Sequence, residues 1–222
     1  FQYNGWFFFA CMGLLADYLR GKAVTVGFRL CFRLLAFSCV PAYLLSILWA
    51  GLPWWLYGIA IVAAVVQLAA WGMLLRNLWR ITISPGPTVL RYIVNFTGFA
   101  LLLKFALQLA SAHPSLGTLA FGFRPIVIAY LHLVLLAIIS LFLLWYAFAE
   151  KIVTISRWSV ISLGVFAAAV IANETILASQ GLAAFSYTPI PYSNELLLVA
   201  AVVLFISAAG LSYFCFARKR PL

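Results

Sequence analysis

Residues 125–149 read PIVIAYLHLVLLAIISLFLLWYAFA, a run of 25 positions without a single Asp, Glu, Lys or Arg. An α-helix needs about 20 such residues to cross the ~30 Å hydrocarbon layer of a bilayer. Polar and apolar residues do not alternate along the run, which excludes a strand of a membrane β-barrel. The run therefore predicts a transmembrane helix.

Other apolar runs of similar length occur along the chain. With Pro125–Ala149 they are Phe1–Leu19, Leu30–Ala50, Pro53–Leu75, Val89–Leu109, Val160–Ala178 and Glu195–Ala217. Backbone in lipid must satisfy its own hydrogen bonds, so each run is expected to be helical. The predicted fold class is all-α, a polytopic transmembrane helix bundle of about seven spans. We expect residues 1–222 to form one domain that lacks upstream residues, because the chain does not open with Met.

The composition indicates a lipid environment. Of the 222 residues 67% are hydrophobic and only 8% are charged, whereas soluble domains carry roughly 25% charged residues. So few charges could not cover a surface in water. The lipid bilayer is therefore the expected partner, and we expect an integral protein of the bacterial inner (cytoplasmic) membrane. Nucleic acid is excluded as a partner, because the net charge of +10 is divided among short clusters and forms no basic stripe.

The placement of the basic residues predicts the orientation. Twelve of the 14 lie in the first, third and fifth connections or at the C-terminus. The positive-inside rule makes that side cytoplasmic. With seven spans the N-terminus is then outside and the C-terminus is cytoplasmic. The two longer outer connections, 111–124 and 179–194, are expected to be loops that cap the bundle.

A few polar side chains interrupt the predicted spans. Ionisable groups in lipid are costly and by default mark a site. His132 lies about nine residues into the fifth span, ~13 Å deep at 1.5 Å per residue. Lys104 and Gln108 lie in the outer half of the fourth span, and Asn173 and Glu174 lie near the outer end of the sixth. The sequence predicts an outward-facing polar site from these five residues together with Arg124 and Tyr130.

Each candidate also has a plainer interpretation. Lys104 and Arg124 can extend their charges to the outer headgroups, and Glu174 can be solvated near the interface. His113 precedes Pro114 and can be an ordinary loop residue. His132 can be a core histidine bonded to another helix, or it can be a haem ligand, a metal ligand or a proton carrier.

Two stretches resemble a known family. The run Arg124-Pro-Ile-Val-Ile-Ala-Tyr-Leu-His132-Leu-Val-Leu-Leu resembles the haem-ligand helix of haem–copper oxidase subunit I, in which an Ala-His-x-His core occurs. Tyr130 stands at the first His position, so the resemblance implies one ligand here. The opening Gln2-Tyr-Asn-Gly-Trp-Phe-Phe-Phe9 is similar to a helix start of that superfamily and of NnrS-like membrane proteins.

The resemblance implies a relative that handles haem or copper in a redox or gas-handling role. It does not imply oxygen reduction, because the other copper-ligand histidines are absent. We expect His132 to bind haem or metal, with His113 or an upstream His as a second ligand. Its other ring N–H is expected to bond Gln108, Asn173 or Glu174. The alternatives are a permease for a small solute or ion, and a non-catalytic subunit or scaffold that binds other membrane subunits.

Overall fold

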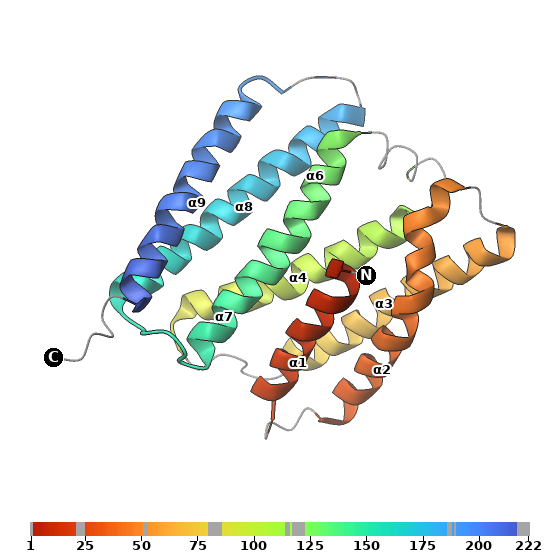
Figure 1. Ribbon diagram of the computed structural model, residues 1–222, viewed down its shortest axis with the longest axis horizontal. Coiled ribbons are helices and arrows are strands. Elements are labelled where there is room, and N and C mark those ends of the chain that lie inside the picture. The colour runs from red at the N-terminus through yellow and green to blue at the C-terminus, as the bar shows by residue number, and fades with distance from the viewer. Residues whose placement is uncertain are drawn as a thin grey trace. The chain divides into compact units, whose positions relative to one another are not determined.

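The computed structural model describes residues 2–20, 25–50, 53–79, 86–113, 116, 123–185, 188 and 190–216. Most of these residues are helical, and no strand occurs among them (Figure 1). In chain order the elements are η1 (Gln2–Phe7), α1 (Phe8–Tyr18), α2 (Thr25–Ala42), η2 (Tyr43–Ala50), α3 (Trp54–Trp79), α4 (Thr88–Ala110), α6 (Arg124–His132), η3 (Leu133–Ser140), α7 (Leu141–Ala149), α8 (Arg157–Phe185) and α9 (Ser193–Phe216).

In the described part of the chain, six helices are long and apolar enough to cross a membrane. They are Gly27–Ile47, Trp54–Trp79, Thr88–Ala110, Arg124–Ala149, Arg157–Ala184 and Ser193–Cys215. This confirms the all-helical class and makes the chain a multi-span membrane protein. The first predicted run is helical over η1 and α1, but these have only 6 and 11 residues. A seventh span and the orientation of the bundle therefore stay predictions.

The chain divides into two compact units. Unit 1 is Phe1–Ile83 with Gly98–Gly122, and unit 2 is Ser84–Thr97 with Phe123–Leu222. Helix α4 contributes its first part to unit 2 and its second part to unit 1. The units are thus not two successive stretches of chain, and the single domain predicted from the sequence stays a prediction.

Small residues hold the helices of unit 1 together. A buried cluster is formed mainly by alanines of α2, α3 and the end of α4: Ala42, Leu45, Ala60, Ala63, Ala64 and Ala112. Short side chains let helices approach closely in a membrane. The buried Trp71 of α3 donates its indole N–H to the carbonyl oxygen of Gly98 in α4, at 3.0 Å. This bond fixes α3 against the second part of α4.

The second predicted span changes its helical form near its C-terminal end. Pro41 lies inside α2, and the chain continues from Tyr43 as the 3₁₀-helix η2. Proline lacks the backbone N–H that would continue the α-helical hydrogen bonds. Within η2 the backbone of Ile47 is non-helical, with φ −119° and ψ 15°. The span therefore leaves the α-helical form shortly after Pro41 and is kinked at Ile47, six residues after the proline.

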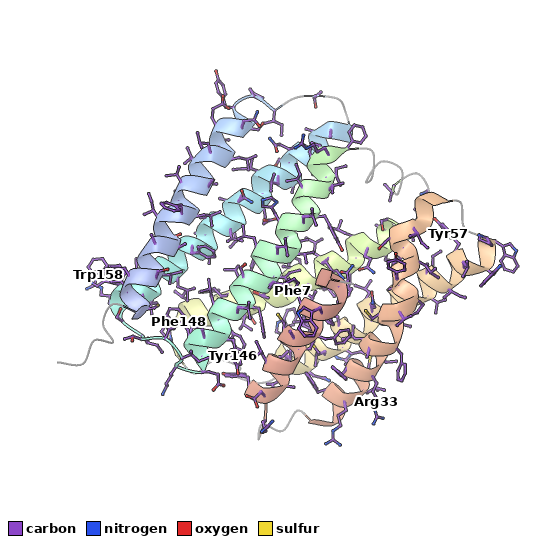
Figure 2. The ribbon with its side chains drawn as sticks, in the orientation of Figure 1. Phe7, Arg33, Tyr57, Tyr146, Phe148 and Trp158 are labelled. Carbon is purple, nitrogen blue, oxygen red and sulfur yellow. The ribbon has the colours of Figure 1, made fainter. Side chains whose placement is uncertain are left out.

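In unit 2, helix α8 packs against both α9 and α6 (Figure 1). A Cβ atom added at Gly210 of α9 would meet the Ser162 hydroxyl of α8 at 3.0 Å, so glycine permits that close approach. At the start of α8, Ser156 and Ser159 exchange backbone-to-hydroxyl hydrogen bonds of 2.8 and 3.1 Å. Such a reciprocal cap satisfies N–H groups that a helix start leaves unpaired. Beside it Trp158 is exposed and stacks on a ring of α9 (Figure 2).

One predicted boundary is wrong. Residues 179–194 were expected to be a loop, but α8 continues through Phe185. The Ser179 hydroxyl donates to the carbonyl oxygen of Thr175 at 2.8 Å, within the helix. Gly181 faces α6, where an added Cβ would meet Ile126 at 3.5 Å. Packing against α6 thus prolongs the helix past the end of its apolar run.

Candidate functional site

The described residues hold two polar groups inside the apolar helices, one in each unit. We call Gln67, Lys104, Gln108 and Cys39 of unit 1 the Lys104 cluster. We call His132, Asn173 and Glu174 of unit 2 the His132 group. The sequence predicted one site containing Lys104, Gln108, His132 and Glu174. The structure brings Lys104 and Gln108 together, and it places Glu174 near His132. That all four residues form one site stays a prediction.

A chain of hydrogen bonds joins α3 and α4 in the Lys104 cluster. The Lys104 ammonium donates to Gln108 Oε1 at 2.8 Å, and Gln108 Nε2 donates to Gln67 Oε1 at 3.1 Å. The three residues are only 4%, 8% and 5% exposed, respectively. Lys104 and Gln108 are four residues apart, which places them on one face of α4. The interpretation of Lys104 as a residue that extends to the headgroups is therefore wrong, because its side chain is bonded inward.

Other groups of unit 1 line the Lys104 cluster. The Lys104 ammonium nitrogen lies 4.2 Å from the centroid of the Phe105 ring, and such a cation–π contact is favourable when water is absent. The Cys39 side chain lies within electrostatic range of Lys104. Its thiol is 3.7 Å from the backbone oxygen of Asn4. The Asn4 Oδ1 atom is buried and has no hydrogen-bond partner among the described residues.

His132 is the last residue of α6, and its side chain is exposed. Its Nδ1 lies 2.9 Å from the carbonyl oxygen of Ile128, one turn earlier. A carbonyl oxygen only accepts, so this contact is a hydrogen bond when Nδ1 carries the proton, and in the neutral imidazole the lone pair is then on Nε2. The prediction that Nδ1 of His132 bonds Gln108, Asn173 or Glu174 is therefore wrong, because its acceptor is the backbone oxygen of Ile128 in the same helix.

Helix α8 places an acid near this imidazole. The Glu174 carboxylate lies within electrostatic range of His132 and accepts a 3.4 Å hydrogen bond from Asn173 Nδ2. Asn173 is buried, whereas Glu174 is partly exposed. The packing of α6 on α8 thus assembles three of the predicted site residues.

The π-helix η3 begins at the residue after His132. It covers Leu133–Ser140, and the Ser140 hydroxyl donates to the carbonyl oxygen of Leu135, five residues earlier, at 2.8 Å. Short π-helical stretches inside α-helices occur frequently at functional sites. No sequence pattern predicts this π-helix. Its start at Leu133 indicates a functional site at the same place as His132 does.

The remaining predicted site residues lie at helix ends or beside His132. Arg124 is the exposed first residue of α6, and Tyr130 lies two residues before His132. Residues two apart do not share a helix face. His113 is exposed just after α4, in unit 1, and its backbone N–H donates to Ala110. A shared haem between His113 and His132 stays a prediction.

Sequence reasoning missed Gln67 and Cys39. Gln67 is the only amide side chain in the predicted span Pro53–Leu75, and a lone amide in an apolar run was a usable signal. Nothing in the sequence context of Cys39 predicts its nearness to Lys104.

The described residues contain no group of three or more His, Cys, Asp or Glu side chains that could hold a metal ion. A metal centre built from protein ligands alone therefore gains no support from them, whereas a haem iron requires only an axial imidazole. Comparison with family models, curated proteins and solved structures finds no match to this chain.

Proposed function

We propose that this multi-span protein of the bacterial inner membrane uses His132 to bind haem or copper, in a redox or gas-handling role. The observation that carries the proposal is the Nδ1–H bond from His132 to the Ile128 carbonyl oxygen, 2.9 Å long. In protein metal sites the ligating imidazole commonly donates its second N–H to an oxygen, which fixes the tautomer and the ring orientation. In the neutral imidazole this bond leaves the lone pair on Nε2, the atom that would bind the metal.

The exposure of His132 supports this proposal. An imidazole ~13 Å along a spanning helix gains little from headgroup water, and leaving it in lipid is costly. A bound group that covers it removes that cost. The flanking Val127 and Leu135 are also exposed, at 38% and 44%, and they offer the apolar surface that a porphyrin face needs. A bound haem would supply the redox or gas-binding chemistry, while His132 holds it and Glu174 sets the local charge.

The experiment is an absorption spectrum and a metal analysis of full-length protein extracted from membranes. We expect wild type to carry haem or copper and His132→Ala to lose it. His113→Ala is the matched control, because it removes the chain's only other imidazole. Loss in both variants identifies His113 as the second ligand. A wild type without cofactor, or a cofactor that His132→Ala retains, contradicts the proposal.

The Lys104 cluster favours a second candidate function, a permease for a small solute or ion. Charged groups buried between spanning helices commonly line transport paths. A transport assay in proteoliposomes with wild type and Lys104→Met tests this alternative. The third alternative is a non-catalytic subunit that binds other membrane subunits. In that case neither His132→Ala nor Lys104→Met is expected to change the amount of bound cofactor or the rate of transport.

The proposed topology places the N-terminus outside and the C-terminus in the cytoplasm, because twelve basic residues lie on one side. A reporter fused after Leu222 is expected to be active only in the cytoplasm. A β-galactosidase fusion is active only when that position is cytoplasmic, and an alkaline phosphatase fusion is active only when it is periplasmic, so the two fusions at the same position should give opposite results. A phosphatase-positive fusion would place the His132 group on the cytoplasmic side.

A further inference from the structure

The Lys104 cluster contains more hydrogen-bond donors than acceptors. An ammonium has three donor hydrogens and each primary amide has two, whereas each amide has one oxygen. Both amide oxygens already accept a bond within the cluster, at Gln108 Oε1 and Gln67 Oε1. No described residue accepts from the Gln67 amide nitrogen or receives a second hydrogen bond from Lys104. Beside the cluster, Asn4 Oδ1 is one further buried acceptor without a partner among the described residues, so the donors still outnumber the acceptors.

The positive charge of Lys104 also has no Asp or Glu partner in its unit. The segments 1–83 and 98–122 contain one acidic residue, Asp17. Asp17 pairs with Arg20 at 3.2 Å, and both side chains of that pair are exposed. Removing an ammonium from water without a counter-ion costs several kcal/mol. A bound anion would both neutralise this charge and accept from the spare donors.

We infer that the Lys104 cluster is a binding site for a small monovalent anion, such as chloride, formate or acetate. The anion accepts from the Lys104 ammonium and from the Gln67 amide nitrogen, while Gln108 holds the two side chains in position. Charge-assisted hydrogen bonds of this kind are roughly twice as strong as neutral ones. The site uses residues of unit 1 alone and does not depend on a cofactor at His132.

Burial selects a free small anion over a lipid phosphate. Lys104 is 4% exposed, and the Phe105 ring beside it packs edge-on against Phe8, with 5.9 Å between the ring centroids. A phosphate that carries two acyl chains needs an open edge beside the cation. The low exposure of Lys104 therefore favours a small free anion.

Thermal unfolding of the full chain in an uncharged maltoside detergent tests the inference. Sodium gluconate, whose anion is bulky, is replaced by sodium chloride, formate or acetate at constant ionic strength. Wild type is expected to gain about 3–6 °C in midpoint temperature at tenfold excess over Kd. Lys104→Met is expected to lose this gain, and Lys151→Met, which removes an exposed lysine, is expected to keep it.

A second variant keeps the test decisive if Lys104→Met does not fold. Gln108→Glu places a carboxylate where the amide oxygen lies 2.8 Å from the ammonium. It is expected to unfold at a higher temperature than wild type in gluconate and to show no further gain with chloride or formate. The inference is overturned by a wild type that does not respond, by Lys104→Met or Gln108→Glu responding like wild type, or by stabilisation with phosphatidylglycerol alone.

Discussion

The Lys104 cluster and the His132 group both place polar side chains in apolar helices, but they differ in burial and in the source of their hydrogen bonds. Lys104 is buried and donates to Gln108 of its own helix, which in turn donates to Gln67 of α3. His132 is exposed and bonds the backbone of its own helix. The first arrangement leaves N–H donors without acceptors among the described residues of unit 1, and the second leaves a ring nitrogen open for a ligand. Polarity in a span therefore does not define a role until the partners are known.

The largest expected difference between the two regions is in stability. Gln67→Leu removes the acceptor for Gln108 Nε2 and leaves a buried amide unsatisfied, which costs about 1–3 kcal/mol. Asn173→Leu removes a longer bond of 3.4 Å to a partly exposed carboxylate and should cost less. Thermal or denaturant unfolding in detergent measures both variants. Equal losses would mean that the two groups are satisfied in the same way.

A smaller effect is expected from the negative charge of Glu174 on the midpoint potential of a redox centre at His132. If a redox centre binds at His132, Glu174→Gln removes a negative charge near it and raises its midpoint potential. Coulomb's law with an effective dielectric of about 20 predicts a shift on the order of tens of millivolts. Spectroelectrochemical titration measures the shift. Lys104→Met is the control in the other region, and an equal shift there would show that the effect is not specific to the His132 group.

The smallest expected effect concerns η3. Ser140→Ala removes the hydroxyl that bonds the Leu135 carbonyl oxygen at 2.8 Å, and hydrogen bonds inside membranes are worth about 0.6 kcal/mol on average. We expect a small loss of stability and a weaker affinity for the cofactor, because η3 begins beside His132. Cofactor titration of the variant checks this. An unchanged affinity would show that the π-helix does not position the imidazole.

The helices could be predicted because lipid imposes a length and an apolar composition on each span. Boundaries were less predictable, since α8 continues over Ser179 and Gly181 through its packing on α6. The hydrogen-bond acceptor for His132 was predicted among side chains of other helices. The imidazole instead contacts the carbonyl oxygen of Ile128, four residues earlier in its own helix. Gln67 was missed because contacts between α3 and α4 depend on helix rotation, which apolar runs do not encode.

The state of the His132 ring can be measured directly by ¹⁵N NMR. In His113→Ala protein labelled with ¹⁵N-histidine, His132 is the only imidazole in the chain. In cofactor-free protein we predict a protonated Nδ1 and an unprotonated Nε2, with the Nε2 resonance alone shifting or broadening strongly when haem or copper is added. A ring that is protonated at Nε2, or an Nε2 resonance that does not respond to either cofactor, would contradict the assignment of His132 as the ligand.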